Sequence, residues 1–112
     1  MPNDPEVSVD IRAAIALRAA RTALGWSQED TAHHSGLAKT TIARLELATG
    51  GASLQNIYAL ISTYGNFGIQ ISDLMQETVS ISYNTATIQE AMKNLSNPDR
   101  KRRDVGQKRS PK

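Results

Sequence analysis

The 112-residue sequence contains no cysteine, and this absence removes several classes of function at once. Disulfide bridges, thiolate nucleophiles and cysteine-based zinc sites are all excluded. Aromatic residues are also scarce, at 4% of the chain, whereas 39% of the residues are hydrophobic. A core with so few rings consists mainly of alanine, leucine and isoleucine, which favours a small helical domain over a sandwich or a barrel.

A long apolar run and a positively charged leader are missing as well. Residues 1–20 carry acidic residues and prolines where a secretory signal carries positive charge. No uninterrupted apolar stretch approaches the length that spans a membrane. We therefore expect a soluble, cytoplasmic protein that consists of one small domain with short additions at its ends.

Positive charge is scarce over most of the chain. Residues 1–98 hold six basic and nine acidic residues, whereas residues 99–112 hold seven basic and two acidic residues. The isoelectric point of about 9.2 therefore comes from the tail and does not by itself establish nucleic-acid binding by the folded part. We expect residues 98–112 to be a disordered basic tail, either solvated or in non-specific contact with DNA.

The first part of the chain is typical of a flexible arm followed by helices. Residues 1–9 include two prolines, show no helical period and are expected to form the arm. Over residues 10–24 apolar residues recur at helical spacing, and Gly25 suits a left-handed helix end. Ser27 can cap a short second helix that ends at Gly36.

Two further helices complete a bundle within residues 10–66, which we expect to be one domain. One covers about residues 39–48 and is broken by the polar segment 49–51. The other follows Ser53, which can cap it. The apolar residues of this fourth helix have the spacing of one buried stripe: Leu54, Ile57, Tyr58, Ile61 and Tyr64.

After Gly65 the hydrophobic period changes from helical to alternating. Residues 68–73 and 78–83 both alternate apolar with polar side chains, which predicts two strands of a hairpin. A competing interpretation lets Ser72 cap a short helix over residues 73–77. The fold class expected from the whole pattern is mainly α: a four- to five-helix bundle with a C-terminal hairpin and a short helix.

The last helix is expected to begin at a capping box formed by Thr87 and Glu90 and to end at Asn97-Pro98. The apolar faces of residues 67–97 extend beyond the bundle and need a partner. We therefore expect residues 67–97 to form a dimerisation segment.

The residues between Gln28 and Leu45 carry the strongest functional signal. Ala32 lies four residues after Gln28, Gly36 four residues further on, and Ile42 six residues after that. Two steeply crossing helices need a small residue where their backbones approach, a glycine where the turn requires a positive φ, and a β-branched side chain in the angle between them. Three different steric requirements are met at three fixed offsets.

The motifs GWSQEDTAHHSG, LAKTTIARLE and SLQNIYAL lie in this region. Over about residues 12–64 the sequence resembles the helix-turn-helix family of the lambda repressor and Cro type, also called the xenobiotic-response-element (XRE) type. The resemblance implies that residues 10–66 are a DNA-binding domain: a lambda-repressor-like bundle of four or five helices, usually dimeric and usually part of a transcriptional regulator.

The resemblance also implies roles for single residues. Lys39, Thr40 and Arg44 match the recognition-helix positions that face the major groove, and Thr40 and Arg44 share one helix face by their spacing. Arg44 can bind the O6 and N7 atoms of guanine, and Lys39 can reach guanine or a phosphate. Thr40 can contact a base edge or a thymine methyl group.

Other matching positions are expected to contact the DNA backbone or to hold the motif together. Gln28 matches a residue that holds a phosphate and supports the recognition helix. Expected phosphate contacts are Ser27, Gln28, Thr41, Thr49 and Gly50, and the expected structural residues are Ala32, Gly36, Ile42, Leu45, Arg21 and Glu46. Within the second set, Arg21 and Glu46 match an internal ion pair of the family.

The sequence departs from the family pattern at four positions. Thr31 stands where leucine is usual, and Ala38 replaces the usual polar cap of the recognition helix. Ala48 and Ala52 occupy positions where glycine and proline are common. A missing N-cap typically costs about 0.5 to 2 kcal/mol of helix stability.

The two histidines and the tryptophan have structural interpretations. His33 and His34 are neighbours on a helix, point about 100° apart and have no further histidine or cysteine to complete a metal shell, so we expect neither metal nor cofactor. Trp26 is expected to pack between the first two helices. We find no converging set of acid, base and nucleophile, and therefore expect no enzyme.

The expected function is sequence-specific binding of a pseudo-palindromic double-stranded DNA operator by a homodimer. Such a protein acts as a repressor or dual regulator of a phage, mobile-element or bacterial operon. Two alternatives stay open. One is a DNA-binding antitoxin whose C-terminal segment neutralises a toxin, and the other is a protein-interaction adaptor that has lost DNA binding.

Overall fold

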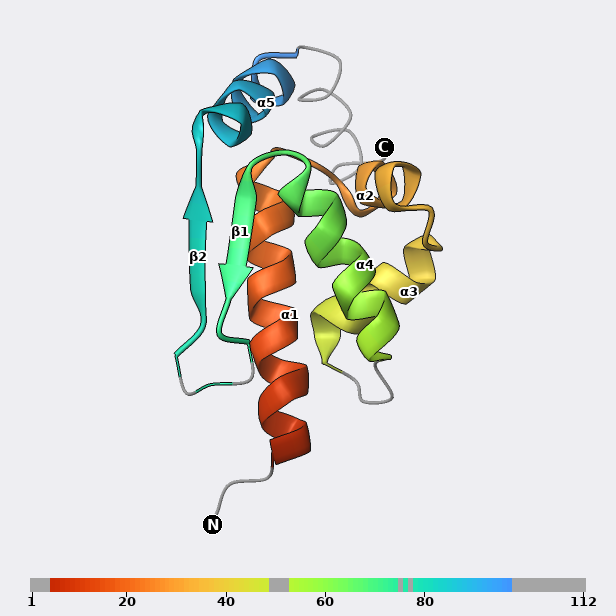
Figure 1. The fold of residues 1–112 in the computed structure, drawn as a ribbon. Helices are drawn as coiled ribbons and strands as arrows, with labels where there is room; N and C mark the ends of the chain where they lie inside the picture. Colours follow the sequence, from red (N-terminus) through yellow and green to blue (C-terminus); the bar gives the residue numbers. More distant parts are fainter. Residues whose placement is uncertain (1–4, 49–52, 75, 77, 98–112) are drawn as a thin grey trace, which may run out of the picture.

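Five helices and one hairpin make up the described part of the chain in a computed structural model (Figure 1). The structure describes residues 5–48, 53–74, 76 and 78–97. The elements are α1 (Pro5–Ala23), α2 (Gln28–Ser35), α3 (Lys39–Leu47), α4 (Leu54–Gly65), β1 (Ile69–Ser72), β2 (Ser80–Tyr83) and α5 (Thr85–Leu95). This architecture confirms the expected mainly α fold with a C-terminal hairpin and short helix.

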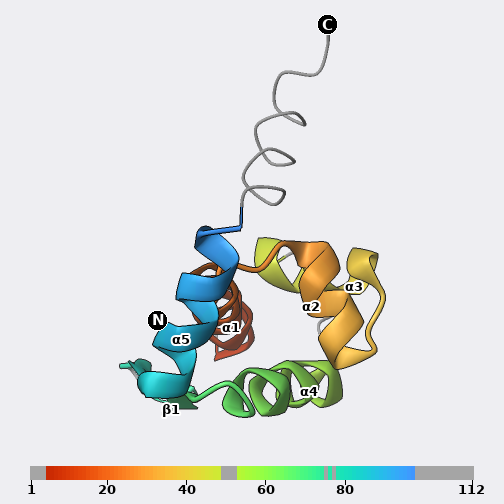
Figure 2. The same ribbon diagram turned by 90° about the horizontal axis from the view of Figure 1, so that it is seen from above.

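Helix α1 is the central element of the molecule. Seen along its axis in Figure 2, α2 and α3 lie to one side of α1, while α5 and the hairpin lie to the other side. Helix α4 closes the bundle between these two groups. The recognition helix expected from the sequence therefore lies on the opposite side of α1 from the C-terminal segment.

The start of α1 differs from the expectation. The helix begins at Pro5, so the arm expected over residues 1–9 is wrong for residues 5–9. Proline is tolerated in the first turn of a helix because its missing N–H would have no intrahelical partner there, and its fixed φ already suits the helix. Residues 1–4 lie outside the described part of the chain.

The expected caps of α2 and α4 are confirmed. Ser27 accepts a hydrogen bond from the Asp30 amide at 3.0 Å, and the Ser27 amide donates to Asp30 Oδ2 at 2.8 Å, which together form a capping box for α2. Gly36 follows α2 with a φ of 80°. Ser53 caps α4 by accepting from the Asn56 amide at 3.2 Å. Local sequence chemistry alone therefore sets these boundaries.

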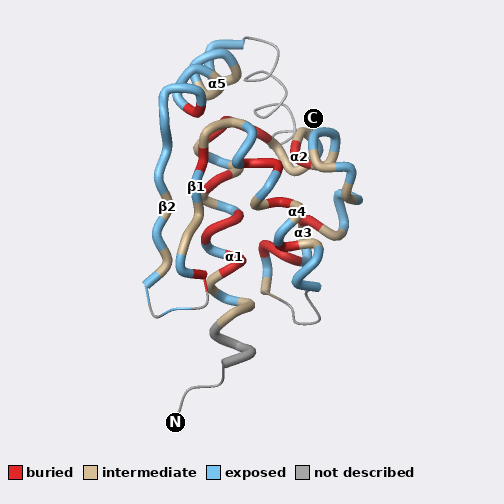
Figure 3. Tube along the Cα trace, in the orientation of Figure 1, coloured by how far each residue is buried: buried red, intermediate tan, exposed pale blue. Residues whose placement is uncertain are grey.

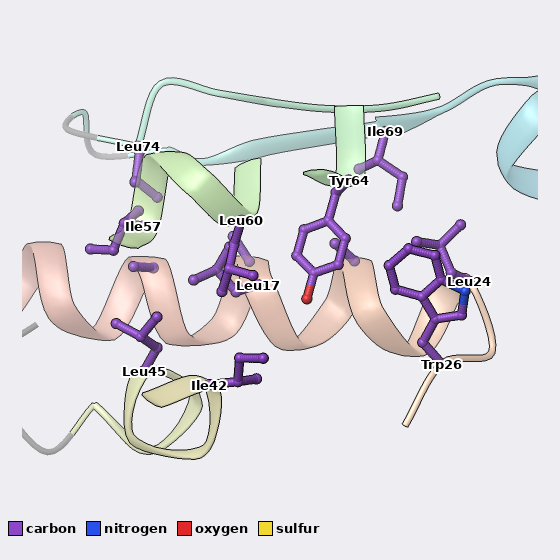
Figure 4. Packing of buried hydrophobic residues seen from close by; sticks show 13 residues of the cluster. Leu17, Leu24, Trp26, Ile42, Leu45, Ile57, Leu60, Tyr64, Ile69 and Leu74 are labelled. Carbon is purple, nitrogen blue, oxygen red and sulfur yellow. The ribbon is translucent and has the colours of Figure 1, made fainter. Parts of the chain in front are cut away.

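The core lies between α1, α3, α4 and the hairpin (Figures 3 and 4). Alanines on α1 allow the other helices to approach closely, and larger side chains fill the space around Leu17. The stripe expected on α4 is correct for Ile57 and Tyr64 but wrong for Leu54 and Tyr58, which are 48% and 54% exposed. Leu60 is buried in their place, because the inward face of α4 runs through positions spaced three and four residues apart around Leu60.

The hairpin interpretation of residues 67–83 is confirmed over the short-helix alternative. Strands β1 and β2 pair antiparallel, with Ile69 opposite Tyr83 and Ile71 opposite Ile81. Ile69 is buried in the core, and Ile71 and Ile81 pack against it. The alternating pattern therefore predicts both the strands and their inward face.

The expected capping box of the last helix is wrong. Asn84, not Thr87, caps α5: its Oδ1 accepts from the Ala86 amide at 2.8 Å. Thr87 lies inside the helix, is buried, and donates its hydroxyl to the Phe67 carbonyl at 2.7 Å. Gly68 has a φ of +88°, and a Cβ atom there would collide with Asn84. Asparagine is as good a cap as threonine, and the neighbouring Gly68 decides between them by leaving space for it.

Candidate nucleic-acid interface

Helix α3 has a buried back and an exposed front. Ile42 and Leu45 are 0% and 4% exposed and face the core. Lys39, Thr40 and Arg44 are all exposed. The helix therefore presents two cationic side chains and a hydroxyl to solvent from a backbone that the core fixes from behind.

Leu47 adds an apolar residue to this front, which the sequence pattern did not predict. Its side chain is 68% exposed, and it lies three residues after Arg44 and seven after Thr40. This spacing places all three on one helix face. The spacing was readable in the sequence, but a leucine at the end of a helix is more often a core residue.

The carboxylate of Glu46 ties α3 to the rest of the bundle. Arg21 Nε lies 2.7 Å from Glu46 Oε2, and Arg21 Nη2 donates to Glu46 Oε1 at 3.0 Å. The same guanidinium donates through Nη1 to the Trp26 carbonyl at 2.9 Å. The two side chains are only 14% and 3% exposed. A planar guanidinium held by three bonds fixes the angle between α1 and α3.

Gln28 connects the first turn of α2 to the same carboxylate. Its Nε2 donates to Glu46 Oε1 at 3.2 Å, which leaves the second hydrogen of the amide group for another acceptor. Ser27 is half-buried and uses its oxygen as the cap of α2, while its hydroxyl hydrogen can still donate. Thr41 is half-buried on α3. The start of α2 is thus held at a fixed distance from α3.

The turn between α2 and α3 has the expected steric features. Gly36 is exposed, adopts φ 80° and donates its amide to the Ala32 carbonyl at 2.9 Å. Ala32 is half-buried and packs against the core. Thr31, which stands where the family has leucine, is fully buried.

Both ends of α3 show the departures noted in the sequence. Ala38 is the N-cap residue and provides no side-chain hydrogen bond. Ala48 is the C-cap residue, with a φ of 55°. A residue other than glycine is strained in this left-handed region of φ. The remaining residues expected to contact phosphate here, Thr49 and Gly50, lie outside the described residues, as does Ala52.

Trp26 is buried and joins α2 to the C-terminal segment, which no local pattern predicted. Its ring stacks on His34, with centroids 4.3 Å apart and planes at 3°, and meets Phe67 edge-on at 4.8 Å. Its Nε1 donates to Glu90 Oε2 on α5 at 3.0 Å. The expectation that Trp26 packs between the first two helices therefore covers only part of its role.

Glu90 is itself held by neighbours on α5. Asn94 Nδ2 donates to Glu90 Oε2 at 3.0 Å and to the Leu24 carbonyl at 2.8 Å. Partial burial raises the pKa of the Glu90 carboxyl, but the hydrogen bonds from Trp26 and Asn94 outweigh that effect and lower it below its usual value. The carboxylate is therefore the form that these donors stabilise.

The histidines take part in ring packing. The His34 ring lies against Trp26. The His33 ring packs edge-on against the His34 ring, with their centroids 5.5 Å apart. Over the part of the chain that the structure describes, no cluster of three or more histidine, cysteine, aspartate or glutamate residues is placed to hold a metal ion. Over the same residues, no helix combines the length and the apolarity needed to cross a lipid bilayer.

A short helix with a buried back, an exposed basic front and a glycine turn to a supporting helix is the helix-turn-helix unit of DNA-binding proteins. Residues 17–67 match the family model described as helix-turn-helix. The match covers a little under half of the chain and supports a DNA-binding helix-turn-helix domain of the XRE type, as found in transcriptional regulators. Comparisons with the curated proteins and with the solved structures gave no match.

Proposed function

We propose that the protein binds a pseudo-palindromic double-stranded DNA operator as a homodimer and represses transcription of a phage, mobile-element or bacterial operon in the cytoplasm. One observation carries this proposal: Lys39, Thr40 and Arg44 are exposed together on the front of α3, while Ile42 and Leu45 fix its back. A rigid helix with two cations and one hydroxyl on its free face fits the major groove, which admits an α-helix.

The side chains on the front of α3 read base edges in this proposal. Arg44 donates two hydrogen bonds to the O6 and N7 atoms of a guanine, and Lys39 donates to a second guanine or to a phosphate. Thr40 contacts a base edge or a thymine methyl group. Leu47, next to Arg44 on the same face, adds an apolar contact to a thymine methyl group.

Groups at the start of α2 fix the position of the protein on the DNA backbone. Gln28 keeps one amide hydrogen for a phosphate while the other binds Glu46. Ser27 can donate its hydroxyl, and the helix dipole at this end of α2 favours an anion. Thr41 supplies a further hydroxyl from α3, and Thr49 and Gly50 supply a hydroxyl and backbone N–H groups in this proposal. Such contacts set the register without reading sequence.

The proposed homodimer suits the geometry of B-DNA. Two recognition helices that enter adjacent major grooves on one side of the duplex lie about 34 Å apart, one helical turn. A dimer with a two-fold axis therefore reads two inverted half-sites. Residues 67–97, on the other side of α1 from α3, provide the dimer contact in this proposal (Figure 2).

Selection of bound sequences from random duplex DNA tests the proposal. We expect an enriched inverted repeat with half-site centres about one helical turn apart. Arg44→Ala should weaken binding of the selected sequence by about 1 to 3 kcal/mol and relax preference at one base position in each half-site. The matched control is Arg18→Ala, which removes the same exposed charge from α1. Equal effects of the two substitutions, or selection without enrichment, would contradict base reading by α3.

A further inference from the structure

We propose that two copies of the chain associate through the outer edge of β2 (Ser80–Tyr83), so that their hairpins form one continuous four-stranded antiparallel sheet across the two-fold axis. The inference rests on the homodimer of the proposed function and specifies its seam. It does not depend on whether the dimer binds DNA.

The backbone of β2 has one free side. The Asn84 amide donates to the Gly68 carbonyl at 3.1 Å, beside the Ile69–Tyr83 pair. In an antiparallel ladder the groups alternate, so Ser80 and Ser82 direct their N–H and C=O groups toward β1. The N–H and C=O groups of Ile81 and Tyr83 point the other way. The sheet of the described residues has only two strands, and these groups therefore form an open edge.

This edge carries no charge, proline or bulge that would prevent strand pairing. Lysine, proline or a bulge protects most free edges in monomeric proteins. The sequence SISY contains no proline and no charge, and the pairing with β1 runs without a bulge through four residue pairs. Serine, isoleucine and tyrosine fit an extended strand well enough for a second copy to add to it.

The charge distribution favours a second copy over another partner. No charged residue occurs from Thr78 to Gln89, although charges flank this stretch at Glu77 and Glu90. At an isologous interface each residue near the axis faces its own copy, so any charge there would face a like charge. A neutral stretch of this length meets that requirement. An oppositely charged foreign partner would find no charge to pair with.

An apolar surface continues from the edge onto α5. Ile88, Met92 and Leu95 are 55%, 63% and 58% exposed, and Tyr83 is 45% exposed. Together with Ala23 at the end of α1 they line a groove of about 500 Å³. Helix α5 has apolar residues at spacings of four and three along this face, the pattern of a helix that packs against another element. Strand pairing would provide hydrogen bonds and this surface would provide apolar burial.

The two contributions are compatible with one symmetric arrangement. Figure 1 shows β2 leading into α5 at the end of the strand. In an antiparallel pair, α5 of each copy lies beside the Ser80 end of the partner's strand, because α5 follows the Tyr83 end of its own strand. Each copy then gives and receives the same contacts, which is the condition for a closed dimer.

Amide hydrogen exchange tests the seam directly. In the dimer, the amides of Ile81 and Tyr83 should exchange slowly, and dilution to the monomer should speed their exchange by roughly tenfold or more. The amides of Ser80 and Ser82 bind β1 and should stay protected in both states. Exchange at Ile81 and Tyr83 that is fast in a proven dimer would overturn the proposal and would show that the copies meet elsewhere.

A matched pair of substitutions separates the seam from general effects on the sheet. Ser82→Lys places a charge at the free edge, and Gln70→Lys places the same charge directly opposite on β1. Both side chains are exposed, so neither substitution disturbs the core. Sedimentation equilibrium should show that Ser82→Lys weakens dimerisation by roughly tenfold or more and Gln70→Lys much less. Circular dichroism checks that both variants are folded.

The outcomes distinguish this inference from the proposed function. Equal dimerisation by both variants, or a monomer at the highest attainable concentration, would overturn the β2 seam. Enrichment of an inverted repeat in the DNA selection is a separate result, since it reports on α3. A β2-paired dimer that selects no DNA sequence would support the seam and contradict DNA reading.

Discussion

The indole nitrogen of Trp26 donates a hydrogen bond to Oε2 of Glu90, 64 positions further along the chain, at 3.0 Å. This bond joins the turn between α1 and α2 to the last helix. Asn94 strengthens the junction by donating to the Leu24 carbonyl at 2.8 Å. The C-terminal helix is therefore packed onto the helix-turn-helix domain at the place where α2 begins.

Loss of the Glu90 carboxylate should destabilise the protein. Glu90→Ala leaves the indole N–H of buried Trp26 without its acceptor, which costs about 1 to 3 kcal/mol. Urea unfolding at neutral pH, followed by tryptophan fluorescence, measures the change. The control is Gln89→Ala, an exposed neighbour on the same helix, which should change the stability by less than about 0.5 kcal/mol.

The same carboxylate should contribute an acid-dependent part of the stability. The folded-state pKa of Glu90 is lowered, so its contribution is present above the pKa of the unfolded chain and is lost as the pH falls through the folded-state pKa. Glu90→Gln removes this titration. A wild-type stability that falls no more steeply with acid than that of Glu90→Gln would contradict the assignment.

Removal of the Glu46 carboxylate should have a larger effect. Glu46→Ala leaves Arg21 without its ion-pair partner and frees Gln28, and breaking such a pair costs about 3 to 5 kcal/mol. Glu29→Ala removes the same group from an exposed position on α2 and serves as the control. Denaturant unfolding of both variants would show the difference. Similar losses in the two would mean that the ion pair does not hold α3.

The ends of α3 offer two stabilising substitutions. Ala48→Gly relieves the strain of φ 55° and should add about 1 kcal/mol. Ala38→Ser supplies the missing N-cap and should add about 0.5 to 2 kcal/mol. Ala43→Gly, a change in the middle of the same helix, should instead destabilise by about 1 kcal/mol. Thermal unfolding gives the sign of each change, and a loss of stability in Ala48→Gly would contradict the left-handed cap.

The buried hydroxyl of Tyr64 should make the protein less stable in alkali. Burial raises the pKa of Tyr64 to about 12. Because the pKa of Tyr64 is higher in the folded than in the unfolded chain, its neutral hydroxyl contributes to stability below about pH 10. This contribution is lost as the pH rises through about 12. The free energy of unfolding should fall by about 3 kcal/mol over this range. Tyr64→Phe should lose less stability over this range, whereas Tyr58→Phe, at a 54% exposed site, should behave as wild type.

The basic tail predicts a salt effect on DNA binding. Residues 99–112 carry seven basic and two acidic residues. Their removal should flatten the dependence of affinity on salt concentration, by about 0.9 in logarithmic slope for each phosphate that the tail neutralises, with little change in the preferred sequence. Titration of the selected operator at several salt concentrations measures both. An unchanged slope would show that the tail does not contact DNA.

Features that depend on neighbouring residues followed from the sequence. Ser27 and Gly36 bound α2 because a cap and a positive φ act within one turn. The alternation of residues 68–73 and 78–83 predicted a hairpin because side chains on a strand point to opposite faces. The offsets between Gln28, Ala32, Gly36 and Ile42 indicated the helix-turn-helix, because its steric requirements also fall at fixed positions close together in the chain.

Features that depend on distant residues required the tertiary structure. The sequence could not decide between Asn84 and Thr87 as the cap of α5, because the decision depends on space at Gly68 and on the Phe67 carbonyl. It could not orient α4, whose outward face carries Leu54 and Tyr58, because tertiary packing and not local periodicity sets helix rotation. It contained no sign of the Trp26–Glu90 bond, because hydrogen bonding between residues far apart leaves no spacing in the sequence. The residues alone thus determined the helix-turn-helix and the exposed face of α3, and only the packed fold decided how the C-terminal segment joins it.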